Sequence, residues 1–150
     1  MSSEEIVINK ILVATDGSDI SLKAAKHAIK IAKALKARVV CIHGVGTPAY
    51  YTELGQSKMV EEYYKEARRL SSIYLAKIVD LGLKEGIDVK TEIMIDVISV
   101  PDAITNYASN EGIDIIVIGT HGRRGMKRLL LGSVANAVVS HAHCPVLVVR

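Results

Sequence analysis

Short apolar runs alternate along this chain with longer segments in which apolar residues recur every three or four positions. Five apolar runs predict buried strands over residues 10–15, 39–45, 89–95, 113–118 and 145–149. The third run alternates apolar and polar residues, which favours a place at the edge of a sheet. The four segments between the runs have the period of amphipathic helices.

Local signals mark where these helices begin and end. Ser18 is the expected N-cap of the first helix. Pro101 suits the first turn of the third helix, which is expected to stop near Gly112. The second helix is long, ends near Gly82 or Gly86, and carries an apolar stripe expected to be core or interface rather than part of a cofactor site. That stripe comprises Met59, Tyr63, Ala67, Leu70, Tyr74, Ile78 and Leu81.

Strands and helices that follow one another in turn predict a single α/β domain over residues 1–150, a five-stranded parallel sheet with helices on both faces. In a Rossmann-like nucleotide-binding fold with strand order 3-2-1-4-5, the order reverses between strands one and four. Ligands bind at that point, beside the carboxyl ends of the strands. Asp16, after the first strand, and Gly119, after the fourth, are therefore expected to face each other across one crevice.

The segment from Gly119 to Ser133 carries the clearest chemical signal. It follows the fourth strand, is rich in glycine and opens the last helix. Glycines let the backbone approach an anion closely, and the N–H groups of a helix N-terminus point at that anion with a favourable dipole. Ser133 can either cap the helix or bond a phosphate oxygen. The accompanying basic side chains have the charge that phosphate requires: Arg123, Arg124, Lys127 and Arg128.

Spacing excludes two other phosphate motifs. The loop lacks the Gly-Lys-Ser/Thr of a Walker A motif, and a G-x-G-x-x-G motif should follow the first strand, where this chain has Asp16-Gly17-Ser18. Asp16 has two interpretations: a turn residue before the helix, or a carboxylate that accepts hydrogen bonds from ribose hydroxyls. His121 can donate to a phosphate, but the sequence reveals no partner that would make it a general base, so no catalytic residue is assigned.

Composition restricts the remaining classes of function. The 19 basic and 16 acidic residues give a net charge of +3, which is too small to indicate a nucleic-acid-binding surface. No apolar window is long enough to span a bilayer, and the first ten residues lack the layout of a signal peptide. Cys41 and Cys144 are far apart in sequence and are expected to be buried, reduced thiols of a cytoplasmic protein.

Histidines give a weak metal signal. His141, His143 and Cys144 are close in sequence, but positions two apart do not share a helix face and a further ligand would be needed. The expected interpretation is a helix C-terminus with a favourable histidine charge, so no metal site is assigned. His43, inside an apolar strand, is expected to be a hydrogen-bonded core or rim histidine.

Together these motifs resemble the universal stress protein family, in its ATP-binding branch. The resemblance rests on K-I-L-V-A-T-D-G-S near the start, I-D-I-I-V-I-G-T-H-G-R-R-G and L-L-G-S-V-A around the glycine loop, and H-C-P-V-L-V-V near the end. The spacing of Gly119, Gly122, Gly132 and Ser133 is similar to the ATP-binding signature of that family. The resemblance covers essentially the whole chain, apart from the loop 46–57 and the joint 97–100.

The resemblance also implies roles for single residues. Asp16 matches the aspartate that contacts the nucleoside, while Ala14 and Gly44 match residues of the adenine pocket. The loop that begins at Gly119 surrounds the phosphates, and the start of the last helix closes on them. The implied nucleotide-binding residues are Ala14, Thr15, Asp16, Gly44, Val45, Ile118, Gly119, Thr120, His121, Gly122, Arg123, Arg124, Gly125, Gly132, Ser133 and Val134.

Two positions depart from the family pattern. Ala14 stands where some ATP-binding members have proline, and Gly44 stands where a bulkier aliphatic residue often supports the adenine. A glycine there is expected to lose apolar contact worth about 1 kcal/mol or more, unless Val45 fills the space.

In function, the resemblance implies a nucleotide-dependent switch or sensor in a stress response. Its ligand would be ATP, or AMP or ADP, with Mg²⁺ or Mn²⁺ beside the phosphates. Members are commonly cytoplasmic homodimers paired through the final strand, here the one from Pro145 to Val149. A protein partner of unknown identity is expected, whereas a membrane or a nucleic acid is not. Two alternatives stay open: very slow ATP hydrolysis, and an interaction module that works without nucleotide through the long helix and the loop 46–57.

Overall fold

The computed structural model describes residues 3–48, 58–122 and 131–150. Its centre is a parallel sheet with the strand order β3-β2-β1-β4-β5, which confirms the predicted fold class. The strands are β1 (Lys10–Ala14), β2 (Arg38–Gly46), β3 (Val89–Val97), β4 (Ile115–Gly119) and β5 (Val146–Val149). β3 lies at an edge of the sheet, as its alternating pattern predicts.

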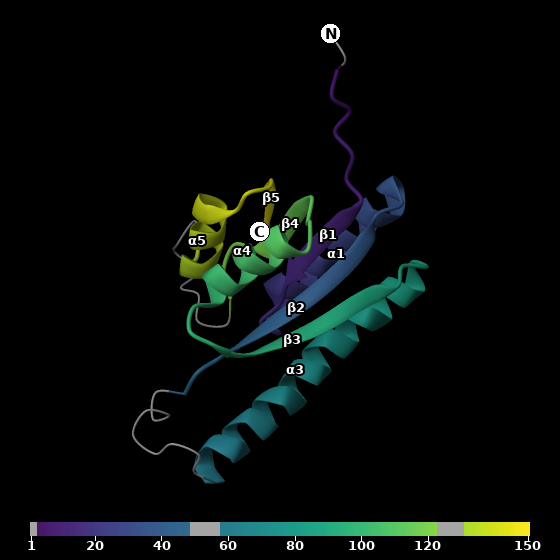
Figure 1. The fold of residues 1–150 in the computed structure, drawn as a ribbon. Helices are drawn as coiled ribbons and strands as arrows, with labels where there is room; N and C mark the ends of the chain where they lie inside the picture. The colour runs from purple at the N-terminus through teal and green to yellow at the C-terminus, as the bar shows by residue number, and fades with distance from the viewer. Residues whose placement is uncertain (1–2, 49–57, 123–130) are drawn as a thin grey trace.

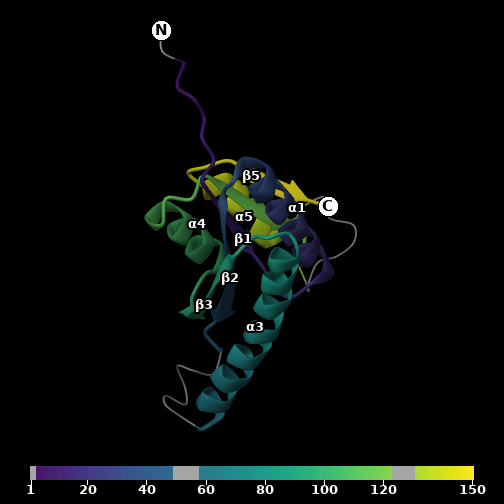
Figure 2. The ribbon, with the colours of Figure 1, turned by 90° about the vertical axis from the view of Figure 1, so that its right-hand side faces the viewer.

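Helices cover both faces of the sheet (Figures 1 and 2). The helices α1 (Asp19–Leu35) and α3 (Lys58–Lys84) pack on one face, and α4 (Val100–Asn110) and α5 (Ser133–His141) pack on the other. Val13 and Cys41 belong to the core under α1 and α3, while Leu12 and Ile42 belong to the core under α4 and α5. Because neighbouring residues of a strand point to opposite faces, a sheet covered on both sides requires nearly continuous apolar runs.

The strand ends differ from the predicted ones by two residues or fewer. One difference of two residues is at β4, which begins at Ile115 although Ile113 is buried. Between them, the Asp114 carboxylate accepts hydrogen bonds from the backbone N–H groups of Asn9 (2.8 Å) and Lys10 (2.9 Å). The polar residue that interrupts the apolar run therefore holds the entry to β1, and the ladder starts after it.

The predicted starts of α1 and α4 are confirmed. Ser18 is the N-cap of α1, and its hydroxyl accepts a hydrogen bond from the N–H of Ser21 at 3.2 Å. Pro101 lies in the first turn of α4, after the N-cap Ser99. None of the helices in the described ranges is both long and apolar enough to cross a membrane.

The two cysteines differ in their surroundings. Cys41 is buried in the core, and burial raises the pKa of its thiol. Cys144 is partly exposed, which corrects the expected burial, because it lies in the connection between α5 and β5 rather than in a strand. Burial also raises the pKa of the Cys144 thiol.

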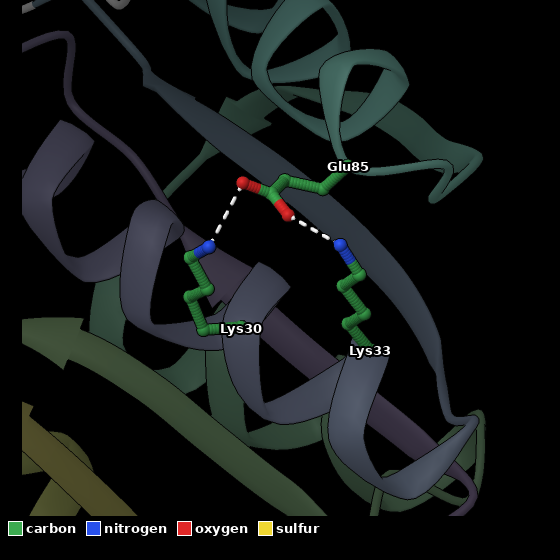
Figure 3. Close-up of polar contacts among 3 residues, drawn as sticks. All are labelled: Lys30, Lys33 and Glu85. Carbon is green, nitrogen blue, oxygen red and sulfur yellow. Dashed lines mark hydrogen bonds and ion pairs between the residues drawn. The ribbon is translucent and has the colours of Figure 1, made fainter.

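Glu85, just after α3, links α3 to α1 (Figure 3). Its carboxylate accepts hydrogen bonds from Lys30 and Lys33 of α1, each at 2.9 Å. These two bonds, first that of Lys33 and then that of Lys30, lower the pKa of Glu85 from its usual value of 4.5 to about 2.

We expect Glu85→Gln to lower the melting temperature slightly at neutral pH and much less near pH 2. A folded-state pKa below the unfolded value stabilises the fold above the unfolded value, and this contribution is lost as pH falls from about 4.5 toward about 2. The effect is small because the charges are exposed, and 1 M salt should reduce it further. Circular dichroism melts at pH 7, 4 and 2 measure it, with exposed Glu62→Gln on α3 as the control. A difference at pH 2 as large as that at pH 7 contradicts the account.

Candidate functional site

A cavity of about 1020 Å³ opens beside the carboxyl ends of β1, β2 and β4. It lies where the strand order reverses, between β1 and β4, as the topology predicts. The predicted residues that line it are Ala14, Thr15, Asp16, Gly44, Val45, Ile118, Gly119, His121, Gly122, Gly132, Ser133 and Val134. Arg123, Arg124 and Gly125 lie outside the described residues.

Asp16 forms the predicted turn and also lines the cavity, while its contact with ribose hydroxyls stays a prediction. Its Oδ1 atom accepts hydrogen bonds from the N–H (3.0 Å) and the hydroxyl (2.5 Å) of Ser18, which form the turn before α1. Its Oδ2 atom lies toward Gly122, where an added Cβ would be 2.1 Å away. The loops after β1 and β4 therefore meet at Asp16 and Gly122, and a side chain at position 122 would require the carboxylate or the loop to move.

Glycines also allow the loop after β4 to close on itself. A Cβ on Gly132 would lie 2.9 Å from the carbonyl oxygen of Thr120 and 3.1 Å from the Cα of His121. The Gly132 N–H donates to that Thr120 oxygen at 2.5 Å, while the Thr120 N–H donates to Val149 at 2.8 Å. The two ends of the glycine loop are thus brought together and tied to β5.

The start of α5 differs from one of the two predictions for Ser133. The N-cap is Gly132, and no side chain caps the helix there. Ser133 is the first helical residue, and it lines the cavity together with Val134 and Ala135. Because the N-terminal turn of α5 forms this wall, the positive end of the helix dipole lies at the cavity.

Two threonines support the site from behind. The Thr15 hydroxyl is 2.9 Å from that of Ser21 and accepts a hydrogen bond from the Gly17 N–H at 3.2 Å. The Thr120 hydroxyl is 3.0 Å from Nδ1 of His121. Both threonines are 6% exposed, and their hydrogen bonds hold the loops after β1 and β4 in position. Thr15 also lines the cavity.

Val100 and Met94 border the space beside Gly44. A Cβ on Gly44 would lie 3.5 Å from Val100 of α4 and 3.8 Å from Met94 of β3. Both distances are ordinary van der Waals contacts, so this position accepts a methyl group. Val45 is itself buried and lines the cavity at a neighbouring position.

The first half of α3 forms a wall that the sequence prediction missed. Its apolar stripe is core in the second half of the helix, at Ile78, with Leu81 packed against that core. A helix of 27 residues is about 40 Å long, whereas a strand of 9 residues spans about 30 Å, so the helix overhangs the sheet. That length difference is the signal that could have revealed the wall (Figure 1). The α3 residues that line the cavity are Met59, Tyr63, Glu66, Ala67, Leu70 and Tyr74.

His43 also lines the cavity and is hydrogen-bonded, as predicted for a rim histidine. Its Nδ1 is 2.6 Å from the hydroxyl of Ser71, which donates to the carbonyl of Ala67 at 2.6 Å. The Tyr74 ring meets the His43 ring edge to face, with centroids 5.5 Å apart. The same Tyr74 ring would be 2.5 Å from a Cβ on Gly17, whose φ of +79° also favours glycine. Tyr74 of α3 therefore packs against both the end of β2 and the turn after β1.

The histidines near the end of the chain do not gather with other ligands. Within the described residues, no three His, Cys, Asp or Glu side chains are arranged to hold a metal ion. Nδ1 of His141 is 2.8 Å from the Ala137 carbonyl in the last turn of α5, and His143 is exposed. Their arrangement is that of a helix C-terminus.

Comparison with known proteins gives a consistent family. A model of the universal stress protein family matches residues 8–150. A universal stress protein of Methanocaldococcus jannaschii is 40% identical over 152 residues, which cover 97% of this chain and 84% of that protein.

Solved structures agree. The universal stress protein UspA from Lactobacillus plantarum matches with a TM-score of 0.84 at 28% identity, over 97% of this chain and 100% of that chain. A universal stress protein crystallised in complex with cAMP matches with a TM-score of 0.67 at 25% identity, over 96% of this chain and 98% of that one. With a family model matching nearly its whole length, this chain belongs to the universal stress protein family.

Proposed function

We propose that this protein binds ATP in the cavity between β1 and β4 and acts as a nucleotide-dependent regulatory switch. The observation that carries the proposal is the meeting of Asp16 and Gly122 beside the start of α5, which has no side-chain cap. A carboxylate for ribose hydroxyls and a helix N-terminus for phosphates thus lie on the walls of one cavity. The relative crystallised with cAMP supports a nucleotide as the class of ligand.

In the proposed arrangement the adenine lies near Ala14, Gly44 and Ile118, and the ribose near Asp16. The phosphates lie at Gly119, Gly122, Gly132 and Ser133. The basic side chains of the loop, Arg123 and Arg124, and the backbone at Gly125 would complete the neutralisation of charge.

A Mg²⁺ or Mn²⁺ ion fits the donors of this cavity. These ions prefer oxygen ligands and usually combine one or two carboxylates with phosphate oxygens. The Asp16 carboxylate and the Ser133 hydroxyl both line the cavity and offer such oxygens. The ion would hold the phosphate chain in place and neutralise part of its charge.

Switching requires that nucleotide binds one conformation or assembly better than another. We propose that the cytoplasmic form of the protein is a homodimer paired through β5, which lies at the edge of the sheet opposite β3. Val146, Leu147 and Val148 of β5 are each partly exposed in the single chain, which supports such pairing. Because Thr120 bonds the backbone of Val149, the glycine loop and this edge are mechanically connected.

The proposal is tested by the nucleotide content of the freshly purified protein, released with acid and separated by chromatography. Calorimetric titration with ATP and then AMP follows on the emptied protein. We expect bound adenine nucleotide, or micromolar to millimolar affinity for ATP that rises with added Mg²⁺. An empty protein that binds neither ATP nor AMP would overturn the proposal and favour an interaction module that works without nucleotide.

A further inference from the structure

The edge strand β3 has features of an interface. Within the described ranges it pairs with β2 and with no other strand, so its outer backbone groups face away from the sheet. Its residues Lys90, Thr91 and Glu92 are exposed. An edge of this kind is a template for a further strand unless something blocks it.

A groove of about 700 Å³ runs between this edge and α3. Leu75, Val79 and Leu83 of α3 line it, together with Thr91 and Ile93 of β3. Leu83 is 62% exposed, although it is a large apolar side chain. Ile73, one turn from groove residue Ala76 on the same helix, is 41% exposed. The groove and its rim therefore leave apolar surface of α3 uncovered beside an unpaired edge.

The charges on β3 favour a second copy of this strand as the partner that pairs with the edge. Lys90 and Glu92 pair with Val40 and Ile42 of β2 and so lie on the α4 side of the sheet, while Thr91 lies between them on the α3 side. In an antiparallel pair of identical strands, opposite residues point to the same face, so the two-fold axis passes through a residue. An axis through Thr91 sets Lys90 of each copy opposite Glu92 of the other.

Four other registers are less favourable. An axis through Lys90 or Glu92 sets like charges opposite each other, and an axis through Met94 sets Glu92 against Asp96. An axis through Ile93 uses Asp96, whose φ of 61° departs from strand geometry and whose carboxylate already accepts hydrogen bonds from Thr47 and Tyr64. The axis through Thr91 also sets Val89 opposite Ile93 on the α3 side.

We propose that β3 is a second self-association surface, on which another copy of this chain adds its own β3 antiparallel with Thr91 at the two-fold axis. The two sheets then continue into one, and the α3 helices of both copies cover the seam, burying the groove and the exposed Leu83. This surface is distinct from β5, at the opposite edge. With both edges paired, the protein can assemble beyond a dimer.

Charge reversal tests the pairing. Lys90→Glu and Glu92→Lys each place like charges opposite each other twice per interface, so each should weaken self-association roughly tenfold. The double variant Lys90→Glu/Glu92→Lys restores opposite charges and should restore the association. Sedimentation velocity of the full chain over a range of concentrations measures all four proteins. Equal association in all four, or a double variant as weak as the singles, overturns the proposal.

The double variant also controls for a neighbour of Glu92. Burial, and after it Glu92, raise the pKa of the Tyr107 phenol, so Glu92→Lys alters the surroundings of Tyr107 as well as the interface. The double variant keeps lysine beside Tyr107. Restored association therefore reports the cross-strand pair and not the contact with Tyr107.

A disulfide tests the register. Opposed residues of an antiparallel pair have Cα atoms about 4.5–5.5 Å apart, which a disulfide can bridge. In a Cys144→Ser background, Thr91→Cys should cross-link two chains under mild oxidation, while exposed Asp88→Cys, about 20 Å from its copy in this register, should not. Equal cross-linking at the two positions overturns the register. The charge-reversal and cross-linking results do not depend on pairing through β5 or on ATP binding, each of which is measured separately.

Discussion

Replacing Gly122 with alanine is expected to lower ATP affinity roughly a hundredfold. The new Cβ would lie 2.1 Å from Oδ2 of Asp16. Asp16 can turn away only by giving up the two hydrogen bonds that its Oδ1 accepts from Ser18 at the start of α1. Either the carboxylate or the loop after β4 has to move, and both movements separate the proposed ribose and phosphate walls.

Gly44→Ala is the matched control for this variant. It makes the same chemical change in the same cavity, but its Cβ would meet Val100 at an ordinary contact distance of 3.5 Å. We expect ATP affinity within about threefold of the unsubstituted protein. Calorimetric titration measures both variants, and thermal melts check that both are folded. Equal losses at the two positions, or an unaffected Gly122→Ala, would contradict the site geometry.

Gly82→Ala is expected to destabilise the fold by about 1–3 kcal/mol. The sign is unusual, because glycine to alanine inside an exposed helix gains up to about 1 kcal/mol. Here the Cβ would lie 2.5 Å from Cγ2 of Val89 and 2.7 Å from the carbonyl oxygen of Ile87. The Ile87 N–H donates to Gly82 at 2.8 Å, so the turn from α3 into β3 cannot open without losing that bond.

Urea unfolding of three variants separates crowding from helix propensity. Gly82→Ala and Val89→Ala are each expected to lower the free energy of unfolding. The double variant should lose less than the sum of the two, because the smaller side chain at position 89 makes room for the new methyl group. A stabilising Gly82→Ala, or strictly additive losses, would show that α3 and β3 are not in close contact there.

Several features of the site could be predicted because they depend on neighbours in the sequence. The cap at Ser18, the turn at Asp16 and the close loop at Gly122 all follow from local residue types. The cap of α5 was harder, because Ser133 has the residue type of a cap but lies one residue inside the helix. Gly132 occupies the cap position, where the backbone comes too close to Thr120 for a side chain.

Other features depend on residues far apart in the chain. Sequence patterns assigned the stripe on α3 to the core or an interface, but they do not compare the length of the helix with that of the strand beneath it. Tyr63 and Leu70 thus became cavity wall instead of core. Val100 of α4 likewise lies beside Gly44 of β2, although the two residues are far apart in the chain. No local sequence pattern predicts that two such distant residues lie side by side.

The sequence by itself determined the alternation of strands and helices, the place of β3 at an edge, and the residues of the two loops that meet between β1 and β4. It could do so because periodicity and turn chemistry record which face of each element is buried and where the backbone needs glycine. Only the tertiary structure decided that α3 walls the cavity, that Val100 and Met94 border the space beside Gly44, and that a groove accompanies the β3 edge. Those features arise from relative lengths and from packing between distant segments, which no single stretch of sequence specifies.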